Sequence, residues 1–346
     1  MWRTIWRTVL CTVGRAAGCI ALVLVLAVVL ERASVVAGAE EHFTSGASRD
    51  TSGLLPPRDT PGEATGEAET VLVDGARIHL LIEDQPFDLP RDELRDWVIR
   101  CARIVAHYYG SFPVDEAYIA IRARRGARVY TGRAFGTVGA VVNVDIGLRV
   151  SRDTLDADWV LIHEMIHLAF PSVARRHHWI EEGLSVYVES IARANSGVLS
   201  PESVWSGFLA GMPRGLPQSG DRGLDYTPTW GRTYWGGALF CLLADIRIRE
   251  QTDGRKTLRD ALRGIVDAGY DITRRSDLRE VLTIADQATG VRVLTGLYDE
   301  MRNRPGIDDL DALWRSLGVS EQGQSVVFDE QATLGEIRRA LTASDL

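Results

Sequence analysis

The stretch LIHEMIHLAF, residues 161–170, places two histidines and a glutamate inside a strongly apolar run. The chain has seven histidines in 346 residues, so finding two of them here beside a carboxylate requires a physical reason. A buried charge without a partner is costly, so groups of this kind pair with one another or hold a metal ion. The surrounding sequence decides between these two explanations.

The residues around this stretch predict one helix. Asp153 or Asp156 can begin it, the run from Asp158 to Phe170 continues it, and Pro171 ends it. Apart from the two histidines and the glutamate, its side chains are apolar nearly all round, so we expect the helix to be buried.

Within this helix, the polar residues have the spacing of a zinc site. Residues i and i+4 lie one turn apart on the same face. His163 and His167 therefore point in the same direction, as two imidazole ligands of one zinc ion must. Glu164 follows the first histidine, where it can act on a water at the metal instead of binding the metal. Catalytic zinc sites use three protein ligands, so one more has to come from another segment.

A second predicted helix supplies candidates for that ligand. The segment WIEEGLSVYVES, residues 179–190, lies on a helix that ends near Gly197 and carries Glu181, Glu182 and Glu189. Glu189 lies on the same helical face as Glu182. There it either contacts a ligand histidine and fixes the orientation of its ring, or it is solvated.

The two segments together resemble a known family. HEMIH followed by WIEEGLSVYVE resembles the paired motifs of the gluzincin metallopeptidases, most closely the peptidase MA-like and glycyl-aminopeptidase-type families. The second motif of these families reads Trp-x-x-Glu-Gly-hydrophobic-small, and its glutamate is the third zinc ligand. The resemblance therefore implies one Zn²⁺ per chain, bound by His163, His167 and Glu182, with Glu164 as the catalytic base.

The resemblance extends over about residues 115–265. A later segment, which begins TYWGG, is similar to a family segment that begins Tyr-x-Lys-Gly. This similarity implies that Tyr234 is the catalytic tyrosine that donates to the oxyanion. The alternative is that Tyr234 only packs, and that Tyr226 or no tyrosine serves the oxyanion. Gly236 stands where the family has a lysine.

Other polar residues near these motifs have weaker claims to the site. No Gly-x-Met-Glu-Asn motif for a substrate's free amine is present, and the glycine-rich stretch 136–147 occupies the corresponding place. Asp145 in this stretch is a candidate partner for a substrate amine. His177 and His178 fall in a basic loop between the two helices, where we expect them to be structural or solvent-facing.

The sequence before the zinc motif predicts strands around one helix. Residues 70–84 predict two strands that are joined by a turn at Asp74-Gly75. An amphipathic helix follows, capped by Asp88 and ended by Gly110.

The remaining pattern indicates the fold class. Strands are expected at 117–123 and 138–147, with a glycine-punctuated stretch between them, and the chain is mostly helical beyond residue 151. Together with the resemblance, this pattern predicts an α+β, zincin-like metallopeptidase. It would have a small strand-rich N-terminal part (70–150), a buried active-site helix and a helical C-terminal part (151–346).

Residues 1–39 predict a signal peptide or an N-terminal membrane anchor. Three arginines precede fifteen apolar residues, 16–30, and Ala37-Gly38-Ala39 fits a signal-peptidase site. The adjacent Glu31-Arg32 pair keeps an uncleaved anchor, and with it membrane association, as the alternative. Either version predicts export to the periplasm or the extracellular space.

The composition of the rest of the chain excludes one class of partner. Residues 40–69 are rich in Gly, Ser, Thr, Pro and Glu and predict a disordered linker before a metallopeptidase domain at 70–346. From residue 40 onward the chain has 35 basic and 46 acidic residues, a net charge of −11. A nucleic-acid partner is excluded, because phosphate binding needs a basic face.

Cys101 and Cys241 occupy apolar helical positions, which favours buried free thiols over a disulfide.

These observations predict an exported zinc-dependent peptidase that hydrolyses peptide bonds in a peptide or protein substrate. The rival hypothesis is a catalytically silent envelope protein that keeps the peptidase fold for binding or as a scaffold. The intact Glu164 favours the enzyme, because a silent scaffold has no use for a base. The sequence leaves open whether the peptidase is an aminopeptidase or an endopeptidase, and it indicates no oligomeric state.

Overall fold

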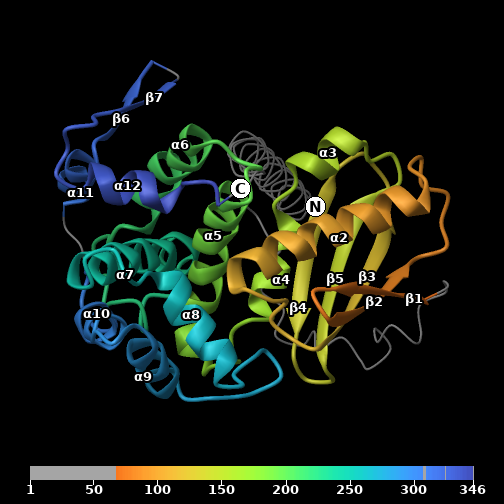
Figure 1. Ribbon diagram of the computed structural model, residues 1–346, viewed down its shortest axis with the longest axis horizontal. Helices are drawn as coiled ribbons and strands as arrows, with labels where there is room; N and C mark the ends of the chain where they lie inside the picture. The colour runs from red at the N-terminus through yellow and green to blue at the C-terminus, as the bar shows by residue number, and fades with distance from the viewer. Residues whose placement is uncertain (1–67, 307–308, 324, 346) are drawn as a thin grey trace, which may run out of the picture. The chain divides into compact units, whose positions relative to one another are not determined.

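Figure 1 shows the computed structural model, which describes residues 68–306, 309–323 and 325–345. The predicted signal peptide or anchor and the linker as far as residue 67 lie outside the described residues. Within the described ranges, no helix is both long enough and apolar enough to cross a membrane. The first described strand begins at Ala68, slightly before the start predicted for the domain.

A five-stranded mixed sheet has the order β1-β2-β3-β5-β4. The outer pairs, β1–β2 and β4–β5, are antiparallel, whereas β2, β3 and β5 run parallel. The turn between the first two strands is the predicted one. Asp74 and Gly75 have φ values of 48° and 91°, the left-handed region that Asp-Gly hairpin turns use. The strands are β1 (Ala68–Val73), β2 (Ala76–Ile82), β3 (Glu116–Arg124), β4 (Val129–Phe135) and β5 (Ala140–Gly147).

β4 is a strand that the sequence does not predict. It occupies the glycine-punctuated stretch, and Gly132 lies in its middle. Its side chains are mostly half-buried, so neither alternation nor apolar content marks it. It forms because it pairs along β5, which is buried on both faces. β4 is therefore an edge strand, and the glycine-rich sequence that was expected beside the site is the interior strand β5.

Helix α2 (Arg91–Tyr109) connects β2 to β3 and lies across the sheet (Figure 1). Gly110 ends it with a φ of 90°, as predicted. Asp88 does not cap it, because Pro90 is the residue at the N-cap and no side chain caps the helix there.

The predicted helix over the zinc motif is broken in two. α3 covers Arg152–Ala157 and α4 covers Val160–His167. Asp158 between them has extended backbone angles, φ −66° and ψ 143°, and its carboxylate accepts a hydrogen bond from the backbone N–H of Leu161 at 3.1 Å. An aspartate that accepts such a bond starts a helix rather than continuing one. The prediction of one continuous helix from Asp153 or Asp156 through Phe170 is therefore wrong, because the helix breaks at Asp158 and α4 ends at His167.

The rest of the chain is mainly helical, so the predicted α+β fold class is confirmed. The helices are α5 (His178–Asn195), α6 (Pro201–Gly211), α7 (Gly237–Gln251), α8 (Leu258–Asp267), α9 (Leu278–Thr289), α10 (Leu294–Met301), α11 (Leu310–Leu317) and α12 (Gly335–Leu341). Short turns of other helix types are η2 (Arg175–His177), η3 (Met212–Gly215) and the π-helical η4 (Arg232–Gly236). A small hairpin, β6 (Val319–Gln322) with β7 (Ser325–Phe328), was not predicted.

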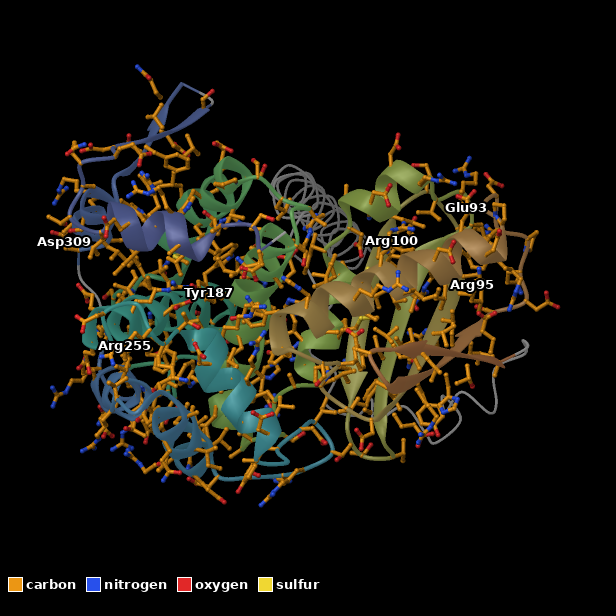
Figure 2. The ribbon with its side chains drawn as sticks, viewed as in Figure 1. Glu93, Arg95, Arg100, Tyr187, Arg255 and Asp309 are labelled. Carbon is orange, nitrogen blue, oxygen red and sulfur yellow. The ribbon has the colours of Figure 1, made fainter. Side chains whose placement is uncertain are left out.

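α5 and α7 form the centre of this helical part. Tyr187 on α5 donates a hydrogen bond to Asp245 on α7 at 3.0 Å, and both side chains are buried. Figure 2 shows Tyr187 among the helices, whereas Arg255 and Asp309 lie at the surface. Among the described residues, Cys101 and Cys241 are buried and free, as predicted.

Candidate metal centre

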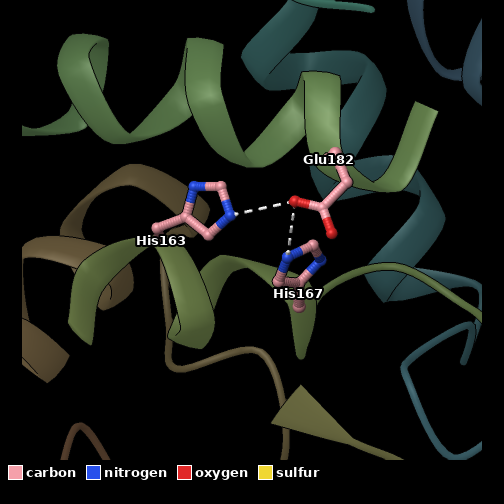
Figure 3. Close-up of side chains that lie close together, drawn as sticks. All are labelled: His163, His167 and Glu182. Atoms are coloured by element: carbon pink, nitrogen blue, oxygen red, sulfur yellow. Dashed lines mark hydrogen bonds and ion pairs between the residues drawn. The ribbon is translucent and has the colours of Figure 1, made fainter. Parts of the chain in front are cut away.

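Helices α4 and α5 bring three of the predicted site residues together. Nε2 of His163 lies 3.3 Å from Oε2 of Glu182, and Nε2 of His167 lies 3.7 Å from the same oxygen (Figure 3). The three ligand atoms all lie within 4.8 Å of one another. Two imidazole nitrogens and one carboxylate oxygen therefore converge on one small volume.

Local packing explains this convergence. His163 and His167 are one helical turn apart, and their rings meet edge to face with centroids 5.0 Å apart. Gly183 follows Glu182 on α5, where a Cβ would lie only 2.3 Å from the Cα of Gly237. α5 can approach the start of α7 this closely only because both residues are glycines, which accounts for the glycine in the second motif.

The start of α5 is fixed by a buried carboxylate that the sequence does not reveal. Asp225 accepts hydrogen bonds from Nδ1 of His177 at 2.8 Å, Nε1 of Trp179 at 2.9 Å and the hydroxyl of Tyr298 at 2.9 Å. Burial alone would raise the pKa of Asp225, but the hydrogen bonds from His177 and Trp179 outweigh it and lower that pKa. His177 is thus structural, one of the two roles expected for it.

The side chain of Glu164 lies against β4. It is buried, and a Cβ on Gly132 would lie 2.3 Å from its Cγ, so only glycine leaves room for it on that strand. Its carboxylate accepts a hydrogen bond from the backbone N–H of Ala134. Burial raises the pKa of Glu164, although the neighbouring His167 and His163 oppose the shift. This position fits a proton-accepting group beside a metal site better than a ligand.

His178 is also part of the site, contrary to its predicted place in a loop. It is the first residue of α5, and its Nε2 lies 3.2 Å from Oε1 of Glu182. Burial disfavours its charged form, but the hydrogen bonds to Glu181 and Glu182 outweigh burial and raise the pKa of His178 to about 10. Burial likewise opposes ionisation of Glu182. The hydrogen bonds from His163, His167 and His178 nevertheless hold its pKa well below the usual range.

The converging residues fit a zinc ion. Bonds of about 2.0–2.1 Å in a tetrahedron separate two ligand atoms by about 3.3 Å, close to the 3.3 Å and 3.7 Å found around Oε2 of Glu182. Histidine and carboxylate are also the donors that catalytic zinc sites use. Nε2 is the nitrogen of His163 that faces the shared point. Nδ1 of the same ring is buried and has no hydrogen-bond partner among the described residues.

Tyr234 lies in the π-helical turn η4, which packs against α5. Its side chain is 3% exposed and stacks on Trp230 with ring centroids 5.7 Å apart. Arg232 anchors the same turn through an ion pair with Asp221 at 2.9 Å and a hydrogen bond to the carbonyl of Gly215 at 2.6 Å. The tyrosine is therefore held on an element that borders α5, whereas Tyr226 is half-exposed.

Two other candidates are engaged elsewhere. Glu189 is buried and pairs with Arg193 at 2.6 Å, so it is neither solvated nor bonded to a ligand histidine in the structure. Asp145 is buried in β5 and pairs with Arg122 at 2.7 Å and with Arg124 at 2.5 Å. The Asp145 carboxylate, which was a candidate partner for a substrate amine, therefore already pairs with two arginines.

No protein-family profile and no curated protein sequence matches this chain. Solved structures do match it. An aminopeptidase N family protein from Idiomarina loihiensis superposes with a TM-score of 0.56 at 14% sequence identity, over 74% of this chain and 50% of that one. The chain shares the fold of this aminopeptidase N family protein.

A second solved structure that matches is an M1 zinc metallopeptidase from Deinococcus radiodurans, in a mutant form. It matches with a TM-score of 0.44 at 17% identity, over 67% of this chain and 51% of that one. The present chain thus spans about half the length of either structure. The zincin-like fold that the sequence predicted is confirmed by the first of these structures.

Proposed function

We propose that this protein is a zinc-dependent peptidase. The observation that carries the proposal is the convergence of His163, His167 and Glu182 on one point, with Glu164 buried on the same helix as the two histidines. The His₂Glu set is one that catalytic zinc sites use, with a position left for water or substrate. One zinc ion per chain follows from the single site of this kind within the described residues.

Each of the chain's own residues then has a distinct task. A bound zinc ion would acidify a water molecule and polarise the carbonyl of the scissile peptide bond. Glu164 accepts the proton of that water and delivers it to the leaving amine. Tyr234 donates a hydrogen bond to the oxygen that becomes negatively charged. β4 pairs only with β5 in the described sheet, so its outer edge offers main-chain groups to an extended peptide.

Replacing Glu164 by glutamine tests this assignment. Glu164→Gln should keep about one zinc per chain, because the residue is not a ligand, and should lose roughly 10²–10⁴-fold in turnover. Metal analysis and peptide-library hydrolysis with free and blocked N-termini provide the two readouts. A folded wild-type protein without zinc, or full activity in Glu164→Gln, would contradict the proposal. Wild-type protein that binds zinc but cleaves no peptide would favour the silent scaffold.

We further propose that the peptidase is exported, on the basis of the sequence of residues 1–39. A fusion of these residues to a reporter that is active only outside the cytoplasm should be active. Retention of the reporter in the membrane fraction would identify an anchor, and its release would identify a cleaved signal peptide. A reporter that stays inactive, while a control with an established signal peptide works, would refute both.

A further inference from the structure

The two oxygens of the Glu182 carboxylate have different partners. Oε2 faces Nε2 of His163 at 3.3 Å and Nε2 of His167 at 3.7 Å, which are the atoms expected to bind zinc. Oε1 faces the other way, toward Nε2 of His178 at 3.2 Å. A carboxylate that has one oxygen held in this manner offers the other to a metal.

His178 is itself held in place. Its Nδ1 lies 2.9 Å from Oε2 of Glu181, and the other oxygen of Glu181 accepts a hydrogen bond from the backbone N–H of Val173 at 3.1 Å. The three side chains are on one side of α5, since positions i+3 and i+4 neighbour position i. A continuous series of contacts therefore runs from the main chain before α5 through Glu181 and His178 to Glu182.

Burial determines how strongly these contacts restrain the Glu182 carboxylate. The Glu182 side chain is 10% exposed, whereas that of His178 is 50% exposed. An ion pair between two exposed groups contributes little, but a partly buried pair is screened less by water and salt, so the contact with His178 restrains the Glu182 carboxylate. Groups behind a metal ligand commonly set its orientation, and their loss weakens metal binding about 10–100-fold.

We infer that His178 is a positioning residue, which holds Oε1 of Glu182 so that this carboxylate binds the metal through Oε2 alone. Glu181 orients the His178 ring for that purpose. The inference rests on the proposed zinc site and adds a contact that the two zinc motifs do not contain. A purely structural role at the start of α5 is the alternative.

Two substitutions of similar size separate these roles in the full-length protein. In His178→Gln the side-chain amide nitrogen is placed near the former Nε2, so it can still donate to Glu182. In His178→Asn the amide nitrogen is placed near the former Nδ1 and reaches only toward Glu181. We expect the glutamine variant to bind zinc within about threefold of wild type and the asparagine variant to bind it about 10–100-fold more weakly. Competition with a chromogenic chelator measures both.

A cobalt-substituted protein gives a readout that does not depend on activity. With Oε1 released in His178→Asn, Glu182 can bind through both oxygens, which raises the coordination number and weakens the visible absorption of Co²⁺. His178→Gln should retain the wild-type spectrum. His79→Ala, which removes another histidine–glutamate pair (His79 to Glu116, 2.8 Å) from the sheet, is the control and should change neither readout.

The zinc affinities and cobalt spectra of these variants decide whether His178 positions Glu182. Wild-type zinc affinity and an unchanged cobalt spectrum in His178→Asn would overturn the inference, as would equal weakening by asparagine and glutamine. If His178→Asn does not fold, Glu181→Ala replaces it, because it removes the support of the ring and should alter the cobalt spectrum in the same direction. Absence of zinc from the wild type would instead refute the proposed function.

Discussion

His163 and Glu164 are adjacent in sequence, yet their side chains serve different partners. Successive helical residues are rotated by about 100°, so the histidine meets Glu182 of α5 while the glutamate meets Gly132 of β4. The two buried carboxylates, Glu164 and Glu182, therefore come from different helices, although the charge of Glu182 still acts to raise the pKa of Glu164. The arrangement follows directly from the spacing of the motif, which is why the sequence could predict it.

The role proposed for Tyr234 leads to a prediction about turnover. Its hydrogen bond to the oxyanion would form mainly in the transition state, so Tyr234→Phe should lower kcat about 10²-fold and leave KM nearly unchanged. Steady-state kinetics together with zinc analysis of the variant provide the measurement. Near-normal turnover with unchanged zinc content would show that Tyr234 only packs, and the same experiment on Tyr226→Phe would then test the alternative.

Other residues of the site could not be predicted from local patterns. His178 was assigned to a loop because nothing in the sequence marks the first residue of a helix that lacks a capping side chain. Asp225 lies more than forty positions from His177 and Trp179, and only the tertiary fold brings it to them. The three proposed zinc ligands could be predicted from the sequence because they lie in two short motifs.

At the level of elements, the break between α3 and α4 shows a local interaction overriding helical periodicity. The apolar pattern continues across Asp158, but its carboxylate accepts a backbone hydrogen bond and the chain turns there. β4 shows the converse, because a sequence without strand pattern becomes a strand when β5 lies beside it. Periodicity therefore predicted the elements with a buried face, such as α2, and missed those that depend on a neighbour.

The buried Asp158 leads to a prediction about pH and stability. Burial raises its pKa from 3.8 to about 6, although the backbone N–H groups of Leu161 and Val160 oppose the shift. Between about pH 4 and pH 6 the folded protein holds a proton that the unfolded chain has released. This residue's contribution to stability therefore falls as the pH rises through that window. Above it, the penalty is about 3 kcal/mol at most, the equivalent of roughly two pKa units.

Asparagine accepts the same capping bond without a charge, so Asp158→Asn should be more stable than wild type at pH 8, by about 1–3 kcal/mol. The difference should shrink as the pH falls toward 4. Urea unfolding of both proteins at several pH values measures this difference, and titrations common to both cancel. A difference that is independent of pH, or that grows on acidification, would contradict the prediction.

For the whole molecule, the zinc site links parts of the chain that are built differently. α4 packs against both α2 and β4 of the strand-rich part, and α5 packs against α7 of the helical part. The three proposed ligands on α4 and α5 thus lie where these two parts meet. The sequence could predict that the motifs come together, but it could not show that a glycine-to-glycine contact between α5 and α7 sets their approach.

A metal ion that binds the folded state and not the unfolded chain stabilises the fold by mass action, by about 2.7 kcal/mol at a hundredfold excess over Kd. Removing zinc with a chelator should therefore lower the Tm of the wild-type protein by several degrees. Glu182→Ala leaves only two histidine ligands, so its Tm should respond little to zinc or chelator. Glu164→Gln is the matched control, because it replaces a buried carboxylate on α4 that is not a ligand, and it should keep the full response.

If Glu182→Ala responds to zinc as strongly as wild type, then another carboxylate binds the metal. Glu181 would be the first to test, since Glu189 is already paired with Arg193.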